Sequence, residues 1–392
     1  MKIALIDPSL FSLPYDVKLA DGLNENGHQV VIFGQNPGRQ PGTDDTRYLH
    51  RHFYPGFSSN FMRGLPPRLF LTLKGLSHIE SMFRLIHRMR TWQPHVIHFQ
   101  WTPLAVVDKH FVPFFRRIAP TVLTVHDSEP FNNNPRARLQ RIDSLDIMRS
   151  FDQLIVHTAA ARARLIARGL MAKSIKVVPH GLLMNISSNV AKQDDAVTDE
   201  RVTLLLFGQI KPYKGVDVLL RAIAALPVAL REKCRVRIVG KAQMQVGPLV
   251  ALAEELGLER LVEFDFRFVP ENEIQNLMEQ ADILVFPYRE IDASGVLMLA
   301  IPAGRVIVAS NIGLFRELLE DGRHGALVSP DDPAALADAL APLIADRQRR
   351  CSAARSVREL AGTIPAWKDI GRMTEKVYQS EIIERSRMSL NV

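Results

Sequence analysis

Residues 202–220 read VTLLLFGQIKPYKGVDVLL and contain one strand, one loop and the start of one helix. The run 202–208 is almost continuously apolar, as expected of a strand that is buried on both faces of a sheet. After a loop that carries Lys211 and Lys214, the segment 215–226 has the apolar spacing of a helix that packs on one face. The stretch therefore predicts one repeat of an α/β domain with a parallel sheet.

The same alternation of short apolar runs and helical segments extends in both directions. In the first half the predicted strands are 2–8, 29–34, 96–100, 121–127, 153–158 and 176–181. In the second half they are 202–208, 235–240, 262–269, 283–288, 306–310 and 326–330, and the predicted helices are 215–226, 247–257, 271–281, 296–303, 313–320 and 333–345. We expect two Rossmann-like, parallel-sheet α/β domains that face each other across a cleft, where ligands of such sheets bind.

One polar, nonperiodic stretch interrupts the alternation. Residues 185–200 read NISSNVAKQDDAVTDE and show neither a helical nor a strand pattern, so we assign them to a linker. The predicted N-terminal domain is then 1–184 and the C-terminal domain 201–365, and a further amphipathic helix is expected within 366–392.

Composition excludes several classes of protein. The 392 residues are 47% hydrophobic and 23% charged, as in ordinary globular proteins rather than disordered, collagen-like or coiled-coil chains. Two cysteines cannot form a disulfide framework, no apolar run is long enough for a spanning helix, and the N-terminus is predicted to be a strand rather than a signal peptide. Of a net charge of +7, residues 1–180 hold 23 basic against 13 acidic side chains, which suggests an anionic surface as a partner of this half.

The motifs of many nucleotide and metal enzymes are absent from the sequence. No G-x-G-x-x-G follows the first strand, and there is no P-loop, HExxH, zinc-ligand spacing, nucleophile elbow or Asp-x-Asp. A diphosphate would therefore be held without a metal, by cationic side chains and helix amides. Lys211 and Lys214 offer the cations, and a helix capped by Ser294 offers the free amides of Gly295, Val296 and Leu297.

The ordered motifs FG-x-I-x-x-YKG-x-D-x-LL, ADILVFPYR, SGVLMLA-x-x-x-G and VIVASNIG resemble glycosyltransferases of the GT-B fold. The chain is most similar to the large retaining family that includes many bacterial polysaccharide mannosyl- and glucosyltransferases. The resemblance is good over 202–345 and thinner over the first half, where PHVIHFQW (94–101), TVHD (124–127), IVHT (155–158) and VVPHG (177–181) match in order.

The resemblance implies roles for individual residues. Lys214 matches the diphosphate-binding lysine, beside Gly208, and Ser294, Gly295 and Val296 match the helix start that cradles the diphosphate. His126 matches a histidine that touches the donor sugar. The family also places Gly181 in the interdomain hinge, has a nucleobase-reading loop at Arg267 and Phe268, and has a last helix, marked here by Trp367, Ile370 and Tyr378, that crosses back onto the first domain.

The sequence also departs from the family pattern. Two glutamates that many members carry fall at Ile291 and Leu299, so Glu290 or Asp292 is expected to reach the sugar instead. Gln209 stands where an arginine is frequent, and Lys211 can compensate for the lost cation. The glycine pair of the first loop is replaced by SLFSLPYD (9–16).

Four histidines lie near predicted strand ends, where side chains approach a cleft. His126 is favoured as a catalytic residue because Asp127 follows it and the family motif supports it. His180 is assigned a structural role beside the hinge, and both roles stay open for His98 and His157.

Residues 61–92 form a basic stretch with interleaved apolar side chains. It contains Arg63, Arg68, Lys74, Arg84, Arg88 and Arg90 among Phe61, Phe70, Met82, Phe83, Met89 and Trp92. Such a segment suits a membrane interface, and the basic excess continues through Arg116, Arg117, Arg136, Arg138 and Arg141. The alternative is an ordinary amphipathic helix that packs on its own sheet.

Together these features favour a metal-independent hexosyltransferase that uses a GDP- or UDP-hexose in cell-surface polysaccharide synthesis. The expected acceptor is a lipid-linked saccharide, reached from the cytoplasmic face of the inner membrane. A sugar-nucleotide 2-epimerase or phosphorylase of the same fold and a non-catalytic binding protein remain alternatives. Nucleic acid is not an expected partner, because no RNA- or DNA-binding module is present.

Overall fold

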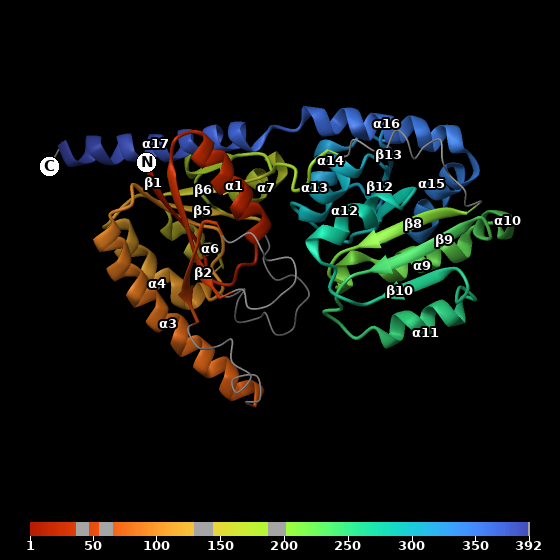
Figure 1. Ribbon diagram of the computed structural model, residues 1–392, viewed down its shortest axis with the longest axis horizontal. Helices are drawn as coiled ribbons and strands as arrows, with labels where there is room; N and C mark the ends of the chain where they lie inside the picture. Colours follow the sequence, from red (N-terminus) through yellow and green to blue (C-terminus); the bar gives the residue numbers. More distant parts are fainter. Residues whose placement is uncertain (37–46, 55–65, 129–143, 187–200, 391–392) are drawn as a thin grey trace. The chain divides into compact units, whose positions relative to one another are not determined.

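The chain forms two compact units, each built on its own parallel sheet. A computed structural model describes residues 1–36, 47–54, 66–128, 144–186 and 201–390. The first unit comprises Met1–Gly181 and Pro365–Val392, and the second comprises Leu182–Ile364. In each unit helices pack against the sheet (Figure 1), which confirms the prediction of two parallel-sheet α/β domains.

The sheet of the first unit has seven parallel strands in the order β3-β2-β1-β4-β5-β6-β7. They are β1 (Lys2–Asp7), β2 (Gln29–Gln35), β3 (Leu49–Phe53), β4 (Val96–Phe99), β5 (Thr121–Thr124), β6 (Gln153–Val156) and β7 (Ile175–Val177). β3 was not predicted, because its sequence LHRHF is short and polar and lacks an apolar run. Among the described strands it occupies the edge of the sheet, and only Phe53 of its five residues is buried.

The helices of the first unit include one that arrives from the far end of the chain. They are α1 (Leu13–Glu25), α3 (Pro67–Trp92), α4 (Ala105–Arg116), α6 (Ser144–Ser150), α7 (Ala159–Ala167), the 3₁₀ turn η2 (Ala172–Ser174) and α17 (Trp367–Leu390). α17 packs against α1 at a glycine contact: a Cβ on Gly22 would lie 2.0 Å from the carbonyl oxygen of Trp367. Only glycine allows the two backbones to approach this closely.

The sheet of the second unit has six parallel strands in the order β10-β9-β8-β11-β12-β13. They are β8 (Val202–Phe207), β9 (Cys234–Val239), β10 (Val262–Asp265), β11 (Ile283–Phe286), β12 (Val306–Ser310) and β13 (Gly325–Val328). The strand order reverses between β8 and β11. Open α/β sheets bind ligands at the carboxyl ends of the strands at such a reversal.

The second unit contains the six predicted helices together with short elements and one long helix that were not predicted. They are η3 (Pro212–Lys214), α9 (Val216–Ala225), α10 (Val228–Arg231), α11 (Gly247–Glu255), α12 (Glu271–Glu279), α13 (Gly295–Ala300), η4 (Ile301–Ala303), α14 (Gly313–Leu318), α15 (Pro333–Ala345) and α16 (Arg347–Thr363). The predicted helix 296–303 is divided into α13 and η4, because Pro302 has no amide hydrogen for a helical bond. The predicted strand 262–269 ends at Asp265. α16 was not predicted, because its sequence is rich in arginine and its apolar face is narrow.

Both sheets bury branched aliphatic side chains on each face. Ile3, Leu5 and Ile6 of β1 and Leu204 and Leu206 of β8 are fully buried. This double burial explains the continuous apolar runs in the sequence. No helix in the described part of the chain is long and apolar enough to cross a bilayer.

Candidate active site

Three predicted site residues converge at the carboxyl end of β8. Gly208 follows β8 with a φ of +119°, a conformation that side chains rarely adopt. A Cβ at this position would lie 3.3 Å from Nζ of Lys214 and 3.2 Å from Cγ2 of Val296. The glycine thus leaves room beside an ammonium group and the first turn of α13, at the reversal of strand order.

The ammonium group of Lys214 is buried against aromatic rings. Lys214 ends η3, and its Nζ donates a hydrogen bond to the phenol of Tyr288 and lies 4.0 Å from the centroid of that ring. The Tyr213 ring is 5.6 Å away. Burial, with a smaller contribution from the charge of Lys211, lowers the pKa of Lys214 to about 7. An anion brought to this position would restore the charged form of the lysine.

Arg289 fixes the turn that carries Lys214. Its guanidinium bonds both carboxylate oxygens of Asp217, at 3.0 and 2.7 Å, and donates to the carbonyl of Pro212 at 2.8 Å. It also pairs with Asp331 at 2.8 Å. Gly215, which follows η3, packs closely against the residue after β11: a Cβ on Gly215 would lie 1.9 Å from the carbonyl oxygen of Pro287. The η3 turn is therefore held from two sides.

The start of α13 differs from the prediction at one residue. Ser294 caps the helix, as predicted, but its Oγ accepts a hydrogen bond from the Leu297 amide at 3.1 Å. The Leu297 amide is therefore occupied and is wrongly predicted as a diphosphate donor. The amides of Gly295 and Val296 precede the first helical bond, from the Met298 amide to the Ser294 carbonyl, and so have no partner within the helix.

The predicted acidic and polar residues flank this convergence. Asp292 is buried in the loop between β11 and α13, where its carbonyl accepts a hydrogen bond from the Leu314 amide at 2.8 Å. Glu290 and Lys211 are half-buried and Gln209 is exposed. All four belong to the same unit as Lys214.

The predicted nucleobase segment lies after β10, two strands from β8. The Arg267 guanidinium pairs with Asp265 at 2.9 Å and with Glu273 at 2.8 Å. Phe268 is 46% exposed. The charge of Arg267 is thus already matched by two carboxylates, whereas the Phe268 ring offers an open apolar face.

His126 belongs to a cluster of histidines in the first unit. It follows β5, and its Nδ1 lies 3.1 Å from Nε2 of His157, which follows β6. The Tyr15 ring packs against His126, His157 and His180, with centroid distances of 5.0, 5.2 and 5.0 Å. Burial lowers the pKa of His157 to about 4 and of His180 to about 3, and holds that of His126 well below its usual value. These rings are neutral at pH 7.

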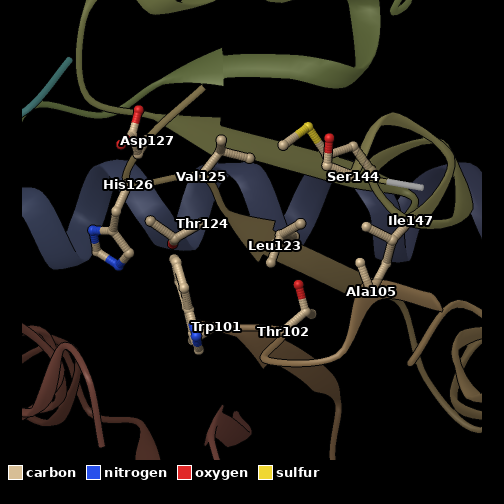
Figure 2. Close-up of a pocket in the computed structure, with 11 residues that line it drawn as sticks. Trp101, Thr102, Ala105, Leu123, Thr124, Val125, His126, Asp127, Ser144 and Ile147 are labelled. Atoms are coloured by element: carbon tan, nitrogen blue, oxygen red, sulfur yellow. The ribbon is translucent and has the colours of Figure 1, made fainter. Parts of the chain in front are cut away.

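A pocket of the first unit opens beside His126 (Figure 2). His126 and Trp101 lie at one side of it, and Ser144 and Ile147 lie at the other. The rest of the lining combines apolar side chains with polar ones: Ala105, Leu123, Val125 and Met148 beside Thr102, Thr124 and Asp127. Trp101 stacks on Phe11 with ring centroids 4.7 Å apart. The pocket's volume of about 30 Å³ leaves room for a water-sized group such as a single hydroxyl, beside an aromatic ring, hydroxyl groups, the Asp127 carboxyl and a neutral imidazole.

Two further histidines of the first unit are held by hydrogen bonds. Both ring nitrogens of His98 are bonded, Nδ1 to the Tyr378 phenol and Nε2 to the Thr124 hydroxyl, each at 2.7 Å. His98 is therefore structural and ties α17 to the sheet. His180 bonds the Gly181 carbonyl at 2.7 Å, where the chain leaves the first unit. No three His, Cys, Asp or Glu side chains of the described residues are grouped so that they could hold a metal.

Sequence reasoning missed two residues that organise the lysine site. Tyr288 and Arg289 lie two and three residues after the end of β11, so their place near a strand end was the available signal. The hydrogen bond from Lys214 to Tyr288 and the clamp of Arg289 on Asp217 join positions more than 70 residues apart. Such partners depend on the order of strands in the sheet, which a single sequence does not specify.

Comparison with known proteins extends over both units. Residues 17–182 match the family described as Glycosyltransferase Family 4, and residues 201–346 match Glycosyl transferases group 1. The D-inositol 3-phosphate glycosyltransferase of Geodermatophilus obscurus is 31% identical over 264 residues, which are 63% of this chain and 58% of that protein. The chain thus matches little more than half the length of this relative.

Two further relatives match over nearly the whole chain. The D-inositol 3-phosphate glycosyltransferase of Thermobispora bispora is 26% identical over 404 aligned residues, 96% of this chain and 91% of that protein. A crystal structure of Anabaena HepE in complex with UDP and glucose shares the fold, with a TM-score of 0.70, 20% identity, and coverage of 97% and 100%. Residues 17–182 and 201–346 thus each match a glycosyltransferase family, and the chain has the two parallel-sheet units of the GT-B fold.

Proposed function

We propose that this protein transfers a hexose from a nucleotide sugar to a saccharide acceptor, with retention of the anomeric configuration. The observation that carries the proposal is the convergence of Gly208, Lys214 and Val296 at the β8–β11 reversal. An ammonium group with a pKa of about 7, an open space beside it and two unoccupied helix amides together suit a diphosphate.

The proposed chemistry is stabilisation of the leaving group. As the bond between the sugar and the diphosphate breaks, negative charge grows on the diphosphate oxygens. The Lys214 ammonium and the amides of Gly295 and Val296 are fixed before the reaction, so they stabilise this charge without rearrangement. In this proposal no metal ion bridges the diphosphate, and Glu290 or Asp292 contacts the sugar.

A UDP-hexose is the first donor to test. HepE was crystallised with UDP and glucose, and it shares the fold of this chain over nearly its full length. GDP-hexoses are the second choice, because the residues proposed to read the base, Arg267 and Phe268, do not favour one nucleobase over the other.

We propose that the acceptor is a lipid-linked saccharide used for cell-surface polysaccharide and that the protein meets it at the cytoplasmic membrane face. Leu69, Leu76 and Phe83 recur every seven residues on α3 and are 46%, 59% and 61% exposed. Exposed arginines border this stripe, among them Arg84 and Arg90. Apolar side chains beside cations suit an anionic lipid surface.

The structure divides the predicted basic stretch into two parts. Met82 and Met89 of α3 are buried in the core of the first unit, as the alternative of an ordinary packed helix requires, while Phe83 and the arginines face outward. Phe61, Arg63, Arg136, Arg138 and Arg141 lie outside the described residues, as does most of the predicted linker.

Donor binding and transfer can be tested in two steps. A thermal-shift screen of UDP, GDP and their glucose, galactose and mannose derivatives should give at least one stabilising ligand. That donor is then incubated with the protein in EDTA, with and without bacterial lipid extract, and products are identified by NMR. Transfer only with acceptor supports the proposal. Conversion of donor alone indicates an epimerase, and binding without turnover indicates a non-catalytic protein.

Membrane attachment is tested separately. The protein should co-sediment with vesicles containing phosphatidylglycerol and much less with pure phosphatidylcholine vesicles, because cations contribute about 1 kcal/mol each at an anionic surface. Leu76→Ser with Phe83→Ser should weaken this binding. Val228→Ser, an exposed apolar residue of the second unit, is the control. Equal binding by the control and the α3 variant would contradict the proposed surface.

A further inference from the structure

A chain of three hydrogen-bonding groups leads from the backbone to His126. The Nδ1–H of His157 donates to the carbonyl oxygen of Val178 at 3.0 Å, since a carbonyl can only accept. The other ring nitrogen of His157, Nε2, lies 3.1 Å from Nδ1 of His126. The backbone after β7 is thus linked to His126 through a single imidazole.

These contacts determine where the protons lie. His157 is neutral at pH 7, since burial lowers its pKa to about 4, and a neutral imidazole that donates from Nδ1 must accept at Nε2. The group that donates to it is the Nδ1–H of His126. Neutral His126 therefore has no proton on Nε2, and this nitrogen carries a lone pair.

The Nε2 atom of His126 is the unsatisfied end of the chain. It is buried and has no hydrogen-bond partner among the described residues. Buried polar atoms without partners are uncommon, and a ligand group is one way in which they are satisfied. His126 also lines the pocket of Figure 2, and the edge-on Tyr15 ring limits its rotation.

We propose that His157 is a positioning residue that holds His126 in the Nδ1–H form, so that His126 Nε2 accepts a hydrogen bond from a hydroxyl group of the bound sugar. An unprotonated nitrogen repels a carboxylate or phosphate oxygen, so this contact favours a neutral, hydroxylated sugar. The inference rests on the proposed function for the identity of the ligand. The hydrogen-bond chain itself does not depend on it.

Two substitutions of His157 test its two hydrogen bonds, to Val178 and to His126, separately. His157→Gln places an amide near the position of Nε2, where its oxygen can accept from His126. His157→Asn is shorter, so it can donate to Val178 as Nδ1 does, but it does not reach His126. His180→Asn is the control, because His180 packs on the same Tyr15 ring and lies outside the chain of hydrogen bonds.

The protonation state is read directly from NMR of full-length protein labelled with ¹⁵N-histidine. Signals of His126 are assigned by their loss in His126→Gln. In the wild type at pH 7.5, we expect an Nδ1 proton and an unprotonated Nε2. His157→Gln and His180→Asn should keep this state, and His157→Asn should shift it towards the Nε2–H form. A proton on Nε2 in the wild type would overturn the inference, even if the variants fail to fold.

Turnover gives the second measurement. With whichever of UDP-glucose, UDP-galactose and GDP-mannose the wild type uses, His157→Asn should lower kcat/KM about tenfold, the loss of one hydrogen bond. His157→Gln should stay within about threefold of wild type. Equal kcat/KM for the two variants contradicts the inference. A wild type that uses no nucleotide sugar contradicts the proposed function instead, and the NMR spectrum still decides the protonation of His126.

Discussion

The buried ammonium group of Lys214 donates a hydrogen bond to the phenol of Tyr288 and lies 4.0 Å from the centre of the same ring. Tyr288 thereby directs the lysine towards the space that Gly208 leaves beside α13. The same burial raises the pKa of Tyr288 well above its ordinary value, so the phenol stays protonated. The lysine is the partner whose charge changes near neutral pH.

Replacement of Lys214 should abolish nucleotide binding. Lys214→Ala removes the cation that the proposed diphosphate meets, and a hydrogen bond to a charged group contributes about 1.5–3 kcal/mol. We expect the thermal shift caused by the best nucleoside diphosphate to disappear. Lys233→Ala, at the exposed amino end of β9, should behave as wild type. A full thermal shift in Lys214→Ala would refute the proposed diphosphate site.

Nucleotide binding should take up a proton above neutral pH. Lys214 has a pKa of about 7 in the unliganded protein, and a bound anion raises it, because the anion favours the ammonium form. At a pH between these two pKa values, nucleotide binding requires protonation of Lys214. The affinity for the nucleotide should therefore fall as the pH rises from 7 to 9. Calorimetry in buffers of different ionisation enthalpy measures the proton uptake directly.

A substitution of Tyr288, the neutral hydrogen-bond partner of Lys214, is the control for this proton uptake. Tyr288→Phe keeps the ring and removes the phenol, so proton uptake should persist with a changed midpoint. An affinity that does not vary between pH 7 and 9 would show that Lys214 is fully charged without ligand.

Loss of Arg289 should weaken nucleotide binding without direct contact with the nucleotide. Its guanidinium joins Asp217, Asp331 and the backbone of η3, so Arg289→Ala releases the turn that carries Lys214. We expect an approximately tenfold weaker Kd, about 1.4 kcal/mol. Arg289→Lys should restore little, because lysine cannot form the forked pair with Asp217. Arg323→Ala, which breaks surface ion pairs in the same unit, is the control. Equal affinity of Arg289→Ala and Arg323→Ala would contradict this role.

The sequence predicts the strands of this fold because their burial is continuous. Runs such as VTLLLF can be recognised locally, whereas the edge strand β3 and the arginine-rich α16 contain no comparable run. Local patterns also identified Lys214 and the cap at Ser294. They could not show that the Ser294 hydroxyl occupies the Leu297 amide, since that depends on the rotamer of one side chain.

The role of His157 illustrates the part that a single sequence cannot supply. Its importance comes from contacts with Val178 and His126, on the strands and loops to either side of it. His98 occupies a similar place at a strand end, yet both its nitrogens are satisfied by Tyr378 and Thr124. Only the arrangement of neighbours distinguishes the two histidines.

Any side chain at Gly208 should interfere with the lysine site. Gly208→Ala places a Cβ about 3 Å from both Lys214 and Val296 and imposes strain at a φ of +119°. We expect loss of the nucleotide-induced thermal shift and a lower melting temperature in the absence of ligand. Gly257→Ala also lies at positive φ, but its Cβ would meet nothing within 4 Å, so it controls for backbone strain. Nucleotide binding by Gly208→Ala at wild-type affinity would show that the space beside Lys214 is not used.

The histidine cluster should make the first unit sensitive to acid. Burial lowers the pKa of His98 and His180 to about 3 and that of His157 to about 4, whereas in the unfolded chain the value is near 6.5. Above pH 6.5 neither state binds protons at these rings, and their contribution to stability is complete. Below pH 6.5 the unfolded chain gains protons that the folded chain excludes, so each ring can lower the free energy of unfolding by up to about 1.4 kcal/mol per pH unit.

Tryptophan fluorescence isolates this effect, because Trp92, Trp101 and Trp367 all belong to the first unit. Burial raises the pKa values of Asp7 and Asp16, which act in the opposite direction, so wild type and variant must be compared. In urea unfolding at pH 7.5, 6 and 5, His157→Gln should lose less stability on acidification than wild type. His87→Gln, exposed on α3, should follow the wild type. Equal pH dependence in all three proteins would show that His157 takes up protons in the folded state as readily as in the unfolded chain.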